Sequence, residues 1–476
     1  MASSTINGVF WSAIDRFGVV LLQFVINLVL ARLLTPNDFG LVGMILIFVV
    51  VSQTLIDSGF GSALIQKLNP TQTDYSTVFW WNLIFSVFLY VIIFALTPNI
   101  AVFFHNQELT SLLRVIAIVI IINSFSLVQK TRLRKSLSFK KIAITDIISY
   151  SLSATIAFYL ANIGIGAWSL VLMQISNATI SAIMFWSVAK WTPSCSFSLS
   201  SLKGLFSYGG FLLIANMMQD VCTHIQGVVI GRHFSAAHTG LYTQAKKMDE
   251  VASMTIPAVF CNVLFPVYSE HQNNKERLCE LLEKNTRLIA FIVFPLMMLL
   301  IIIAEPLFNL LYGDKWLAAV PYFQILCIGG FFSAVYNLNY YAVAAIGKSK
   351  ELFYWGCYKW GILLLLLIVG ASFNMTAVLF AMVISNINIY VTNALLAQYY
   401  IRYKISKQIK NLTPILLCTL TSGCFIYIIS RYILLHWIST SLIFIICYAL
   451  ICIVLRIKAM TEFKSSINII LNKLNQ

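Results

Sequence analysis

The chain alternates between long apolar stretches and short polar connections. A transmembrane helix needs about 20 mainly apolar residues, because the hydrocarbon core of a bilayer is about 30 Å thick. This pattern predicts an all-α integral membrane protein with about 14 transmembrane helices. We expect them at residues 9–34, 40–66, 78–97, 110–128, 142–161, 166–189, 206–230, 241–268, 288–311, 319–346, 353–372, 376–401, 412–432 and 438–456.

Composition agrees with a membrane protein. Hydrophobic residues make up 59% of the chain and charged residues only 10%, whereas soluble domains carry about 25% charged residues. The net charge of +15 would suggest nucleic acid in a soluble protein. Here basic loops beside an anionic cytoplasmic leaflet account for it better. We therefore expect the lipid bilayer as a partner, and no nucleic acid.

The distribution of basic residues predicts the orientation. Most of the Lys and Arg residues fall in loops on the side of the N-terminus, and such loops face the cytoplasm. We therefore place both termini in the cytoplasm. The first residues lack the features of a cleaved signal peptide, so we expect them to lead into a retained first helix. The basic, amphipathic stretch 462–476 is expected to lie on the inner membrane surface.

Motifs for catalysis, metal binding and nucleotide binding are missing from the sequence. The ten cysteines are scattered and form no CxxC pair, which predicts neither a disulfide framework nor a zinc site. The stretch 342–350 ends like a P-loop, but Ala342 replaces the glycine that a phosphate-binding loop requires. We therefore predict a transporter, not an enzyme, without a cofactor or a metal of its own.

An internal repeat is suggested by two similar stretches. Residues 30–43 align with residues 230–243 at an offset of 200, which places Gly40 opposite Gly240. Six helices per repeat is an even number, so both halves would insert in the same direction with a cleft between them. The predicted parts are a six-helix lobe at 1–204, a second six-helix lobe at 205–401, and two further helices with a cytoplasmic tail at 402–476.

Four charges lie near the start of the eighth predicted helix: Lys246, Lys247, Asp249 and Glu250. If that helix starts near residue 239, as the repeat suggests, these charges lie two to three turns inside it. Charged side chains inside a membrane avoid lipid, which favours a cluster that faces a cavity. The alternative is a self-neutralised surface turn, because Lys246 can pair with Asp249 and Glu250 at helical spacing.

The first and seventh predicted helices carry polar residues on one face. Arg16 in the first is a candidate cavity cation, with a position at the inner interface as the alternative. Arg32 ends the same helix, where it faces the cavity or binds helix-end carbonyl groups, and Arg232 is its counterpart in the repeat. In the seventh helix Asp220 and His224 lie one turn apart, as a structural hydrogen-bonded pair or as a proton-coupling pair.

These positions define two sets of candidates. The candidates for binding the substrate in a cationic cavity are Arg16, Arg32, Arg232, Lys246 and Lys247. The candidates for ion coupling are Asp220, His224, Asp249 and Glu250.

Seven segments carry a family resemblance: TPNDFGLVGM (35–44), DSGFGSALIQK (57–67), DYSTVFWWNL (74–83), RLRKSLSFKKIA (132–143), QAKKMDEV (244–251), FPVYSEHQNN (265–274) and YGDKW (312–316). They closely resemble polysaccharide exporters of the colanic-acid-exporter type, within the multidrug/oligosaccharidyl-lipid/polysaccharide (MOP) flippase superfamily. The resemblance runs from the first residue to about residue 450. DSGFGSALIQK with the preceding TPNDFG is its most specific part.

The resemblance implies a two-lobed, MATE-like helical bundle. It also implies that the protein moves undecaprenyl-pyrophosphate-linked oligosaccharide across the bacterial inner membrane for capsule, exopolysaccharide or lipopolysaccharide O-antigen synthesis. A cationic cavity for the pyrophosphate is a further implication. Candidate partners are H⁺ or Na⁺ as the coupling ion, and a polysaccharide polymerase and glycosyltransferases.

Two alternatives stay open at this point. A cation-coupled multidrug exporter of the same superfamily would have a cleft richer in acidic than in basic residues, because its substrates are mostly cationic. A membrane enzyme of polysaccharide assembly would present a catalytic acidic cluster at one leaflet.

Overall fold

The computed structural model describes residues 18–57, 59–432 and 436–465. Within these ranges the backbone forms helices joined by loops, and it contains no strand. The predicted all-α fold class is therefore confirmed. By inter-residue contacts the chain divides into two compact units, Met1–Gly240 and Leu241–Gln476. The division into lobes at 204/205 follows the proposed repeat and stays a prediction.

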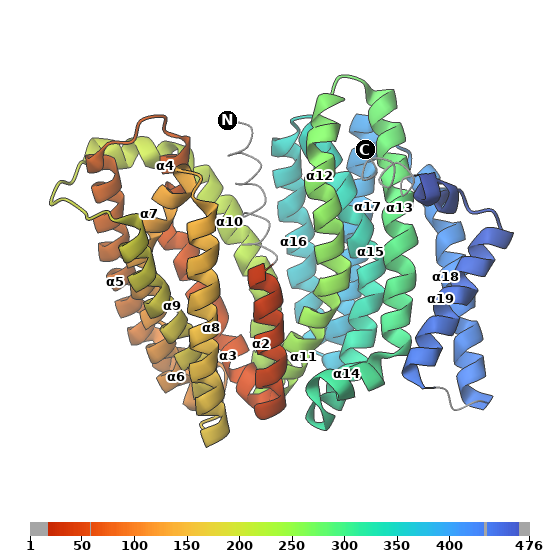
Figure 1. Ribbon diagram of the computed structural model, residues 1–476, viewed down its shortest axis with the longest axis horizontal. Coiled ribbons are helices and arrows are strands. Elements are labelled where there is room, and N and C mark those ends of the chain that lie inside the picture. Colours follow the sequence, from red (N-terminus) through yellow and green to blue (C-terminus); the bar gives the residue numbers. More distant parts are fainter. Residues whose placement is uncertain (1–17, 58, 433–435, 466–476) are drawn as a thin grey trace. The chain divides into compact units, whose positions relative to one another are not determined.

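The first unit is a bundle of mostly long helices, drawn from red to yellow-green in Figure 1. The longest, α10, follows a Ser-rich linker and packs against α3, α4 and α5. Its helices are α2 (Val19–Leu33), α3 (Pro36–Asp57), α4 (Phe60–Gln66), α5 (Gln72–Phe103), α6 (Glu108–Ile116), α7 (Ile118–Lys135), α8 (Phe139–Ile163), α9 (Ala167–Ala189) and α10 (Leu199–His233).

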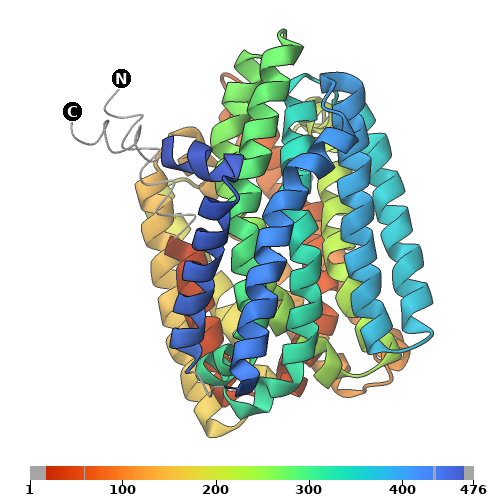
Figure 2. The ribbon, with the colours of Figure 1, turned by 90° about the vertical axis from the view of Figure 1, so that its right-hand side faces the viewer.

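The second unit is also helical, drawn from green to blue in Figure 2. In it α15 packs against α13 and α17, and α18 and α19 pack against each other and against α13. Its elements are α11 (Ala236–Glu250, starting in the first unit), the π-helical turn η2 (Val251–Thr255), α12 (Ile256–Glu270), α13 (Lys275–Ile302), α14 (Ala304–Tyr312), the 3₁₀ turn η3 (Asp314–Ala319), α15 (Val320–Ala345), α16 (Ser349–Ala371), α17 (Met375–Ile401), α18 (Ile405–Tyr432) and α19 (Trp437–Val454).

Twelve helical segments of the described chain are long and apolar enough to cross a membrane. The first predicted helix, 9–34, corresponds in the described chain to α2, which has 15 residues. The seventh corresponds to α10, which has 35 residues but is not among the twelve. Polar residues in its middle, including Asn216, Asp220 and His224, lower its hydropathy. The predicted count of 14 is therefore approximate.

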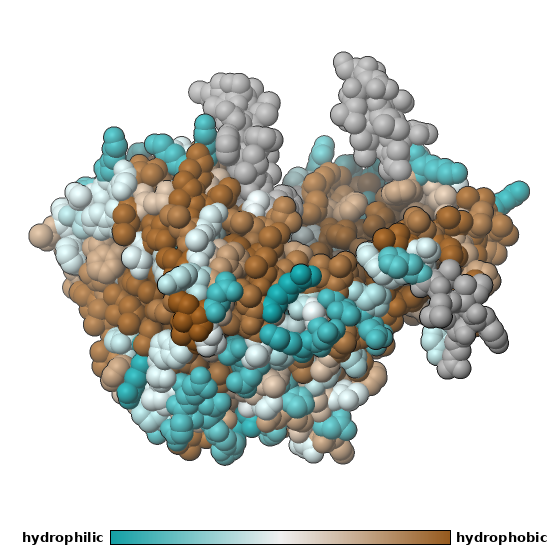
Figure 3. Space-filling model, turned by 60° about the horizontal axis from the view of Figure 1, so that its bottom comes forward, coloured by the Kyte–Doolittle hydropathy of each residue, from teal (hydrophilic) through white to brown (hydrophobic). Residues whose placement is uncertain are grey.

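Large apolar side chains cover much of the surface. Many Leu, Ile, Val and Phe side chains on these helices are more than a third exposed. Figure 3 shows broad hydrophobic areas, with hydrophilic residues gathered below them in that view. In water such areas would drive association, so they are suited to contact with lipid acyl chains.

The Ser-rich linker between α9 and α10, residues 190–198, is held by hydrogen bonds to the start of α5. Ser194 and Ser76 share a hydrogen bond of 2.9 Å, and the Trp80 indole donates to the Ser194 carbonyl at 2.9 Å. Asp74 completes a capping box at the start of α5 and accepts a hydrogen bond from Ser201 in the first turn of α10. These bonds explain why α10 is held within the first unit.

Two glycines form a close helix crossing within the first unit. A Cβ at Gly40 would overlap the carbonyl of Ala236, and a Cβ at Gly240 would overlap the carbonyl of Pro36. In the proposed repeat with its offset of 200 residues, Gly40 corresponds to Gly240 and Pro36 corresponds to Ala236. Each glycine therefore contacts the repeat counterpart of its own neighbour. Small residues let helix backbones approach in membranes.

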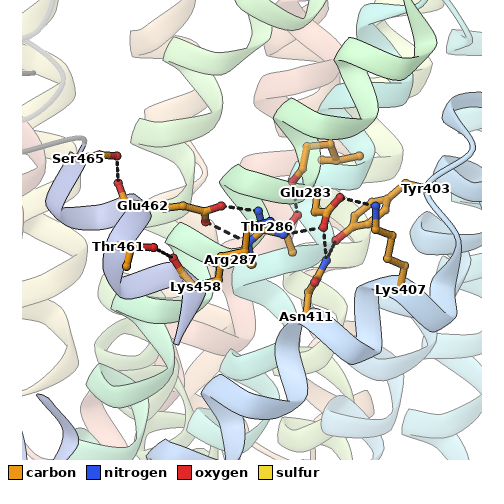
Figure 4. A network of polar contacts seen from close by, with 11 residues as sticks. Glu283, Thr286, Arg287, Tyr403, Lys407, Asn411, Lys458, Thr461, Glu462 and Ser465 are labelled. Carbon is orange, nitrogen blue, oxygen red and sulfur yellow. Dashed lines mark hydrogen bonds and ion pairs between the residues drawn. The ribbon is translucent and has the colours of Figure 1, made fainter. Parts of the chain in front are cut away.

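Charged residues attach the C-terminal helices of the second unit to α13 (Figure 4). Arg287 on α13 is only 7% exposed and forms ion pairs with Glu283 at 2.7 Å and with Glu462 at 2.5 Å. Lys407, at the start of α18, also binds Glu283 at 2.7 Å. The phenyl ring of Phe463 packs on α13 as well, 5.5 Å from that of Phe291. Residues 458–465 are thus part of the fold. The rest of the predicted surface tail, 466–476, lies outside the described residues.

Candidate functional site

A polar pocket of about 610 Å³ lies among the helices of the first unit. Helices α3, α4, α7, α8, α9 and α10 contribute to its lining, and most of the lining side chains can form hydrogen bonds. Pockets of about 300–1,000 Å³ are typical of small-molecule sites. A polar pocket of this size is suited to water or to a polar ligand.

The DSGFG motif shapes one side of this pocket. Asp57 ends α3, and its Oδ1 accepts a hydrogen bond from the amide of Gly61 at 3.2 Å. Gly59 has a φ of 70°, a left-handed conformation that favours glycine. A Cβ at Gly61 would lie only 3.1 Å from the Asp57 carboxyl group. The motif therefore breaks the helix and places the Asp57 carboxylate at the pocket.

Three carboxylates line the pocket: Asp57, Asp146 and Asp220. Asp146 on α8 accepts a hydrogen bond from the Lys130 ammonium at 2.8 Å. Asp220, near the middle of α10, accepts one from the hydroxyl of Thr54 on α3. Each carboxylate therefore has a donor of its own, which stabilises its charge away from bulk water.

Two cations lie one helical turn apart on α7, at the end of the bundle predicted to be cytoplasmic. Lys130 is engaged by Asp146, and its ammonium lies 5.2 Å from the centre of the Phe185 ring. Arg134 is exposed, and no described carboxylate lies within ion-pair distance of it. Among the lining side chains that the structure describes, two cations thus face three carboxylates.

Five amide side chains complete the pocket: Gln53, Asn123, Asn177, Asn216 and Gln219. The Asn123 amide donates to the Gln53 oxygen at 3.2 Å. The Asn177 Oδ1 is buried and has no hydrogen-bond partner among the described atoms. Asn216 and Gln219 on α10 are exposed. Such groups can both donate to and accept from a polar ligand.

The second unit contains an acidic side chain with one oxygen unpaired. Asp249 lies in the last turn of α11, and its Oδ2 accepts a hydrogen bond from the Ser253 hydroxyl at 3.0 Å. Its Oδ1 is buried without a hydrogen-bond partner in the described chain. That oxygen lies near Gly330 and the Met297 sulfur, and the Cys327 thiol forms a hydrogen bond with the Asp249 carboxyl group. The π-helical turn η2 follows directly, and such turns often occur at functional sites.

Lys246 and Glu250 lie in the last two turns of α11. Their charged groups are 3.7 Å apart, and their side chains are 23% and 44% exposed. The Lys246 ammonium also lies 5.8 Å from the centre of the Tyr242 ring. Because α11 begins at Ala236, Lys246 lies about 15 Å along it. Lys247 is exposed. The charges therefore belong to the helix, and their part in substrate binding stays a prediction.

The other basic candidates lie at helix ends or outside the described chain. Arg16 is not among the described residues. Arg32 is exposed in the last turn of α2. Arg232, in the last turn of α10, contacts His105 and lies 5.2 Å from the centre of the Phe103 ring. Arg232 thus holds the end of α10 against the end of α5.

The candidates are divided between the two units. Arg32, Arg232, Asp220 and the half-buried His224 belong to the first unit. Lys246, Lys247, Asp249 and Glu250 belong to the second. Of the candidates that the structure describes, only Asp220 lines the pocket. The common cationic cavity stays a prediction.

Sequence reasoning missed most of the pocket. Its side chains come from six helices, and the strongest available signal was the presence of Gln53, Asn123 and Asn177 inside apolar stretches. Lys359 was not among the predicted candidates either. This lysine is 6% exposed in the middle of α16 and donates to the Asn393 side chain at 2.9 Å.

Comparisons with known proteins agree with this architecture. The teichuronic acid biosynthesis protein TuaB of Bacillus subtilis is 28% identical over 426 residues, covering 88% of this chain and 87% of TuaB. The succinoglycan biosynthesis transport protein ExoT of Rhizobium meliloti is 26% identical, covering 74% of this chain and 72% of ExoT.

Among solved structures, the lipid II flippase MurJ in an inward closed conformation is similar in fold. The TM-score is 0.73 at 15% identity, covering 94% of this chain and 98% of MurJ. The family profile described as "Polysaccharide biosynthesis protein" matches residues 29–321, which is more than half of the chain. The protein therefore belongs to this polysaccharide biosynthesis family, in agreement with the resemblance of its motifs to polysaccharide exporters of the MOP superfamily.

Proposed function

We propose that this protein is a flippase for undecaprenyl-pyrophosphate-linked oligosaccharide in a bacterial inner membrane, with both termini in the cytoplasm. It serves the synthesis of a surface polysaccharide such as capsule, exopolysaccharide or O-antigen. The observation that carries the proposal is the polar pocket within a unit of membrane-spanning helices. Relatives named for polysaccharide biosynthesis and transport support it.

The physical requirement for such a protein is clear. A buried hydroxyl or amide without a hydrogen bond costs about 2–7 kcal/mol in an apolar medium, and an ionised phosphate costs far more. An oligosaccharide head group therefore does not cross hydrocarbon unaided. A pocket lined by amides, hydroxyls and charges replaces the lost water, while the isoprenoid tail stays in the bilayer. Alternate opening of the site to the two leaflets then moves the head group.

Energy and partners complete the proposal. H⁺ or Na⁺ drives the cycle, and Asp249 is the candidate coupling residue because its Oδ1 is buried without a partner in the described chain. Glycosyltransferases supply the lipid-linked oligosaccharide on the inner leaflet, and a polysaccharide polymerase consumes it on the outer leaflet. The pyrophosphate is held by basic residues, for which Arg16, Arg32, Arg232, Lys246 and Lys247 stay the candidates.

One observation favours a second candidate function. The pocket has three carboxylates and two cations among its described lining residues, and an acid-rich site suits the cationic substrates of a multidrug exporter. The amides of the same pocket suit a neutral, hydroxyl-rich ligand equally well. The two functions therefore have to be separated by experiment.

Deletion of the gene, followed by extraction of lipid-linked intermediates, separates them. For a flippase we expect loss of the surface polysaccharide and accumulation of lipid-linked oligosaccharide that is accessible only from the inner leaflet. Unchanged intermediates, together with raised sensitivity to cationic drugs, would instead identify a multidrug exporter.

A further inference from the structure

We infer that the pocket of the first unit binds sugar residues of the lipid-linked oligosaccharide, and that the pyrophosphate binds elsewhere. This inference rests on the proposed function and names the part of the substrate that this pocket holds. It follows from the charges of the described lining residues, from their amide side chains, and from the aromatic ring and volume of the pocket.

The charges disfavour a pyrophosphate. The described lining holds two cations and three carboxylates, and Lys130 is already neutralised by Asp146 at 2.8 Å. Arg134 is left to act on an anion, and it shares the pocket with the Asp57 carboxylate. A pyrophosphate carries more than one negative charge and needs several uncompensated donors or cations when it leaves water. The described lining does not supply them.

The neutral groups favour a sugar. Sugar hydroxyls both donate and accept hydrogen bonds, which is also what amide side chains do, while carboxylates accept only. Asn177 Oδ1 is a buried acceptor without a donor in the described chain, so a ligand hydroxyl can satisfy it. Asn216 and Gln219 are exposed on the facing side of α10 and add two more donor–acceptor groups.

The residues that shape the pocket fit the same ligand. Tyr150 is half-buried in the lining, and an aromatic ring offers an apolar face to the C–H groups of a pyranose. The volume of about 610 Å³ lies in the usual range for small-molecule sites. The combination of amides, carboxylates and a ring therefore assigns the pocket to a carbohydrate.

Binding to the purified full-length protein in detergent tests the inference. The probes are the free oligosaccharide repeat released from the surface polysaccharide of the source strain, and inorganic pyrophosphate. We expect calorimetry to detect the oligosaccharide, and Gln219→Leu to weaken its binding about tenfold, because a ligand hydroxyl loses its partner. Asn177→Leu is the second variant, in case one of them fails to fold.

The matched control is Gln272→Leu, the same exchange at an exposed glutamine of the second unit that does not line the pocket. We expect it to change oligosaccharide binding by less than about twofold. Arg134→Gln removes the lining cation that has no ion pair with a described carboxylate, and it tests whether pyrophosphate binds in the pocket. Binding of pyrophosphate that disappears in Arg134→Gln, with no effect of Gln219→Leu on the oligosaccharide, would overturn the inference.

The outcomes also separate this inference from the proposed function. If the purified protein does not bind the oligosaccharide while the deletion strain still accumulates inner-leaflet intermediates, the sugar pocket is wrong and the flippase stands. If the pocket instead binds a cationic dye such as ethidium, and the lipid-linked intermediates of the deletion strain are unchanged, both the sugar pocket and the flippase function are wrong.

Discussion

Asp249 combines three structural features in one membrane helix. Its Oδ1 is buried without a hydrogen-bond partner in the described chain, its neighbours at that oxygen are a glycine and sulfur-bearing side chains, and a π-helical turn follows it. A sodium ion prefers several oxygen ligands, whereas a proton needs only the carboxylate itself. At the residue scale Asp249 is therefore suited to exchange a proton during the cycle.

Replacement of Asp249 by Asn tests this role. Asn keeps the shape of the side chain but cannot exchange a proton, so we expect a folded protein whose transport no longer depends on the pH gradient. The measurement is translocation of a fluorescent lipid-linked oligosaccharide in proteoliposomes with an imposed gradient. Glu250→Gln is the comparison, because Glu250 is 44% exposed and ion-paired. An unchanged gradient dependence in Asp249→Asn would refute the assignment.

Single residues also mark the limit of prediction from the sequence. Asp220 was identified because a lone acid in an apolar stretch is costly, and the structure places it at the pocket. Asp57 and Lys130 were not among the candidates, because charged residues near helix ends are common at the membrane interface. Only the packing of six helices shows that these side chains meet.

At the scale of elements, the network around Arg287 connects α13, α18 and residues 458–465 (Figure 4). The Arg287 side chain is 7% exposed and that of Glu462 is 15% exposed. Removal of Glu462 would leave the nearly buried Arg287 with Glu283 as its carboxylate partner in the described chain, and Lys407 shares Glu283. The loss of such a hydrogen-bonded charged contact costs about 1.5–3 kcal/mol. The network therefore contributes strongly to the position of the C-terminal helices.

Glu462→Ala is accordingly expected to lower the melting temperature of the detergent-solubilised protein clearly. Glu280→Ala serves as the control, because Glu280 forms an ion pair with Arg277 at the surface and is 67% exposed. Exposed pairs contribute only about 0–1 kcal/mol, so this variant should melt like the wild type. Equal melting of all three proteins would show that the network adds nothing to stability.

The crossing of α3 and α11 allows a second test at this scale. Gly40→Ala places a methyl group against the Ala236 carbonyl, which we expect to destabilise the protein by about 1–3 kcal/mol through forced separation of the helices. Gly204→Ala is the matched control, because nothing lies within 4 Å of its added Cβ. Thermal unfolding compares them, and a Gly40→Ala protein as stable as Gly204→Ala would contradict the crossing.

Helix prediction succeeded where the apolar pattern was strong. Most of the expected spans have a helical counterpart of suitable length. Helix α10 was also predicted, at 206–230, although its polar residues keep it out of the twelve strongly apolar segments. The break between α3 and α4 was not foreseen, since it depends on the backbone conformation of Gly59 and on a hydrogen bond to Asp57.

At the scale of the whole molecule, the basic loops predict that both chain ends face the cytoplasm. A fluorescent protein that folds only in the cytoplasm, fused after residue 476, should therefore be bright. Alkaline phosphatase fused at the same place should be inactive, because it requires an oxidising compartment. The reverse pair of results would invert the proposed direction of every helix.

The family and the all-helical class were recognisable from the sequence because short motifs and hydropathy are local properties. The boundaries of the two compact units were not, because they depend on which helices pack together. The Ser-rich linker illustrates this, since its hydrogen bonds to α5 keep α10 in the first unit.

The crossing at Gly40 and Gly240 has an evolutionary consequence. Each glycine faces a main-chain carbonyl of the other helix, and a carbonyl is present whatever residue occupies that position. A substitution in the partner helix therefore cannot create room for a side chain. Among relatives that keep this contact, both positions should stay glycine independently of each other, without the correlated exchanges that side-chain contacts allow.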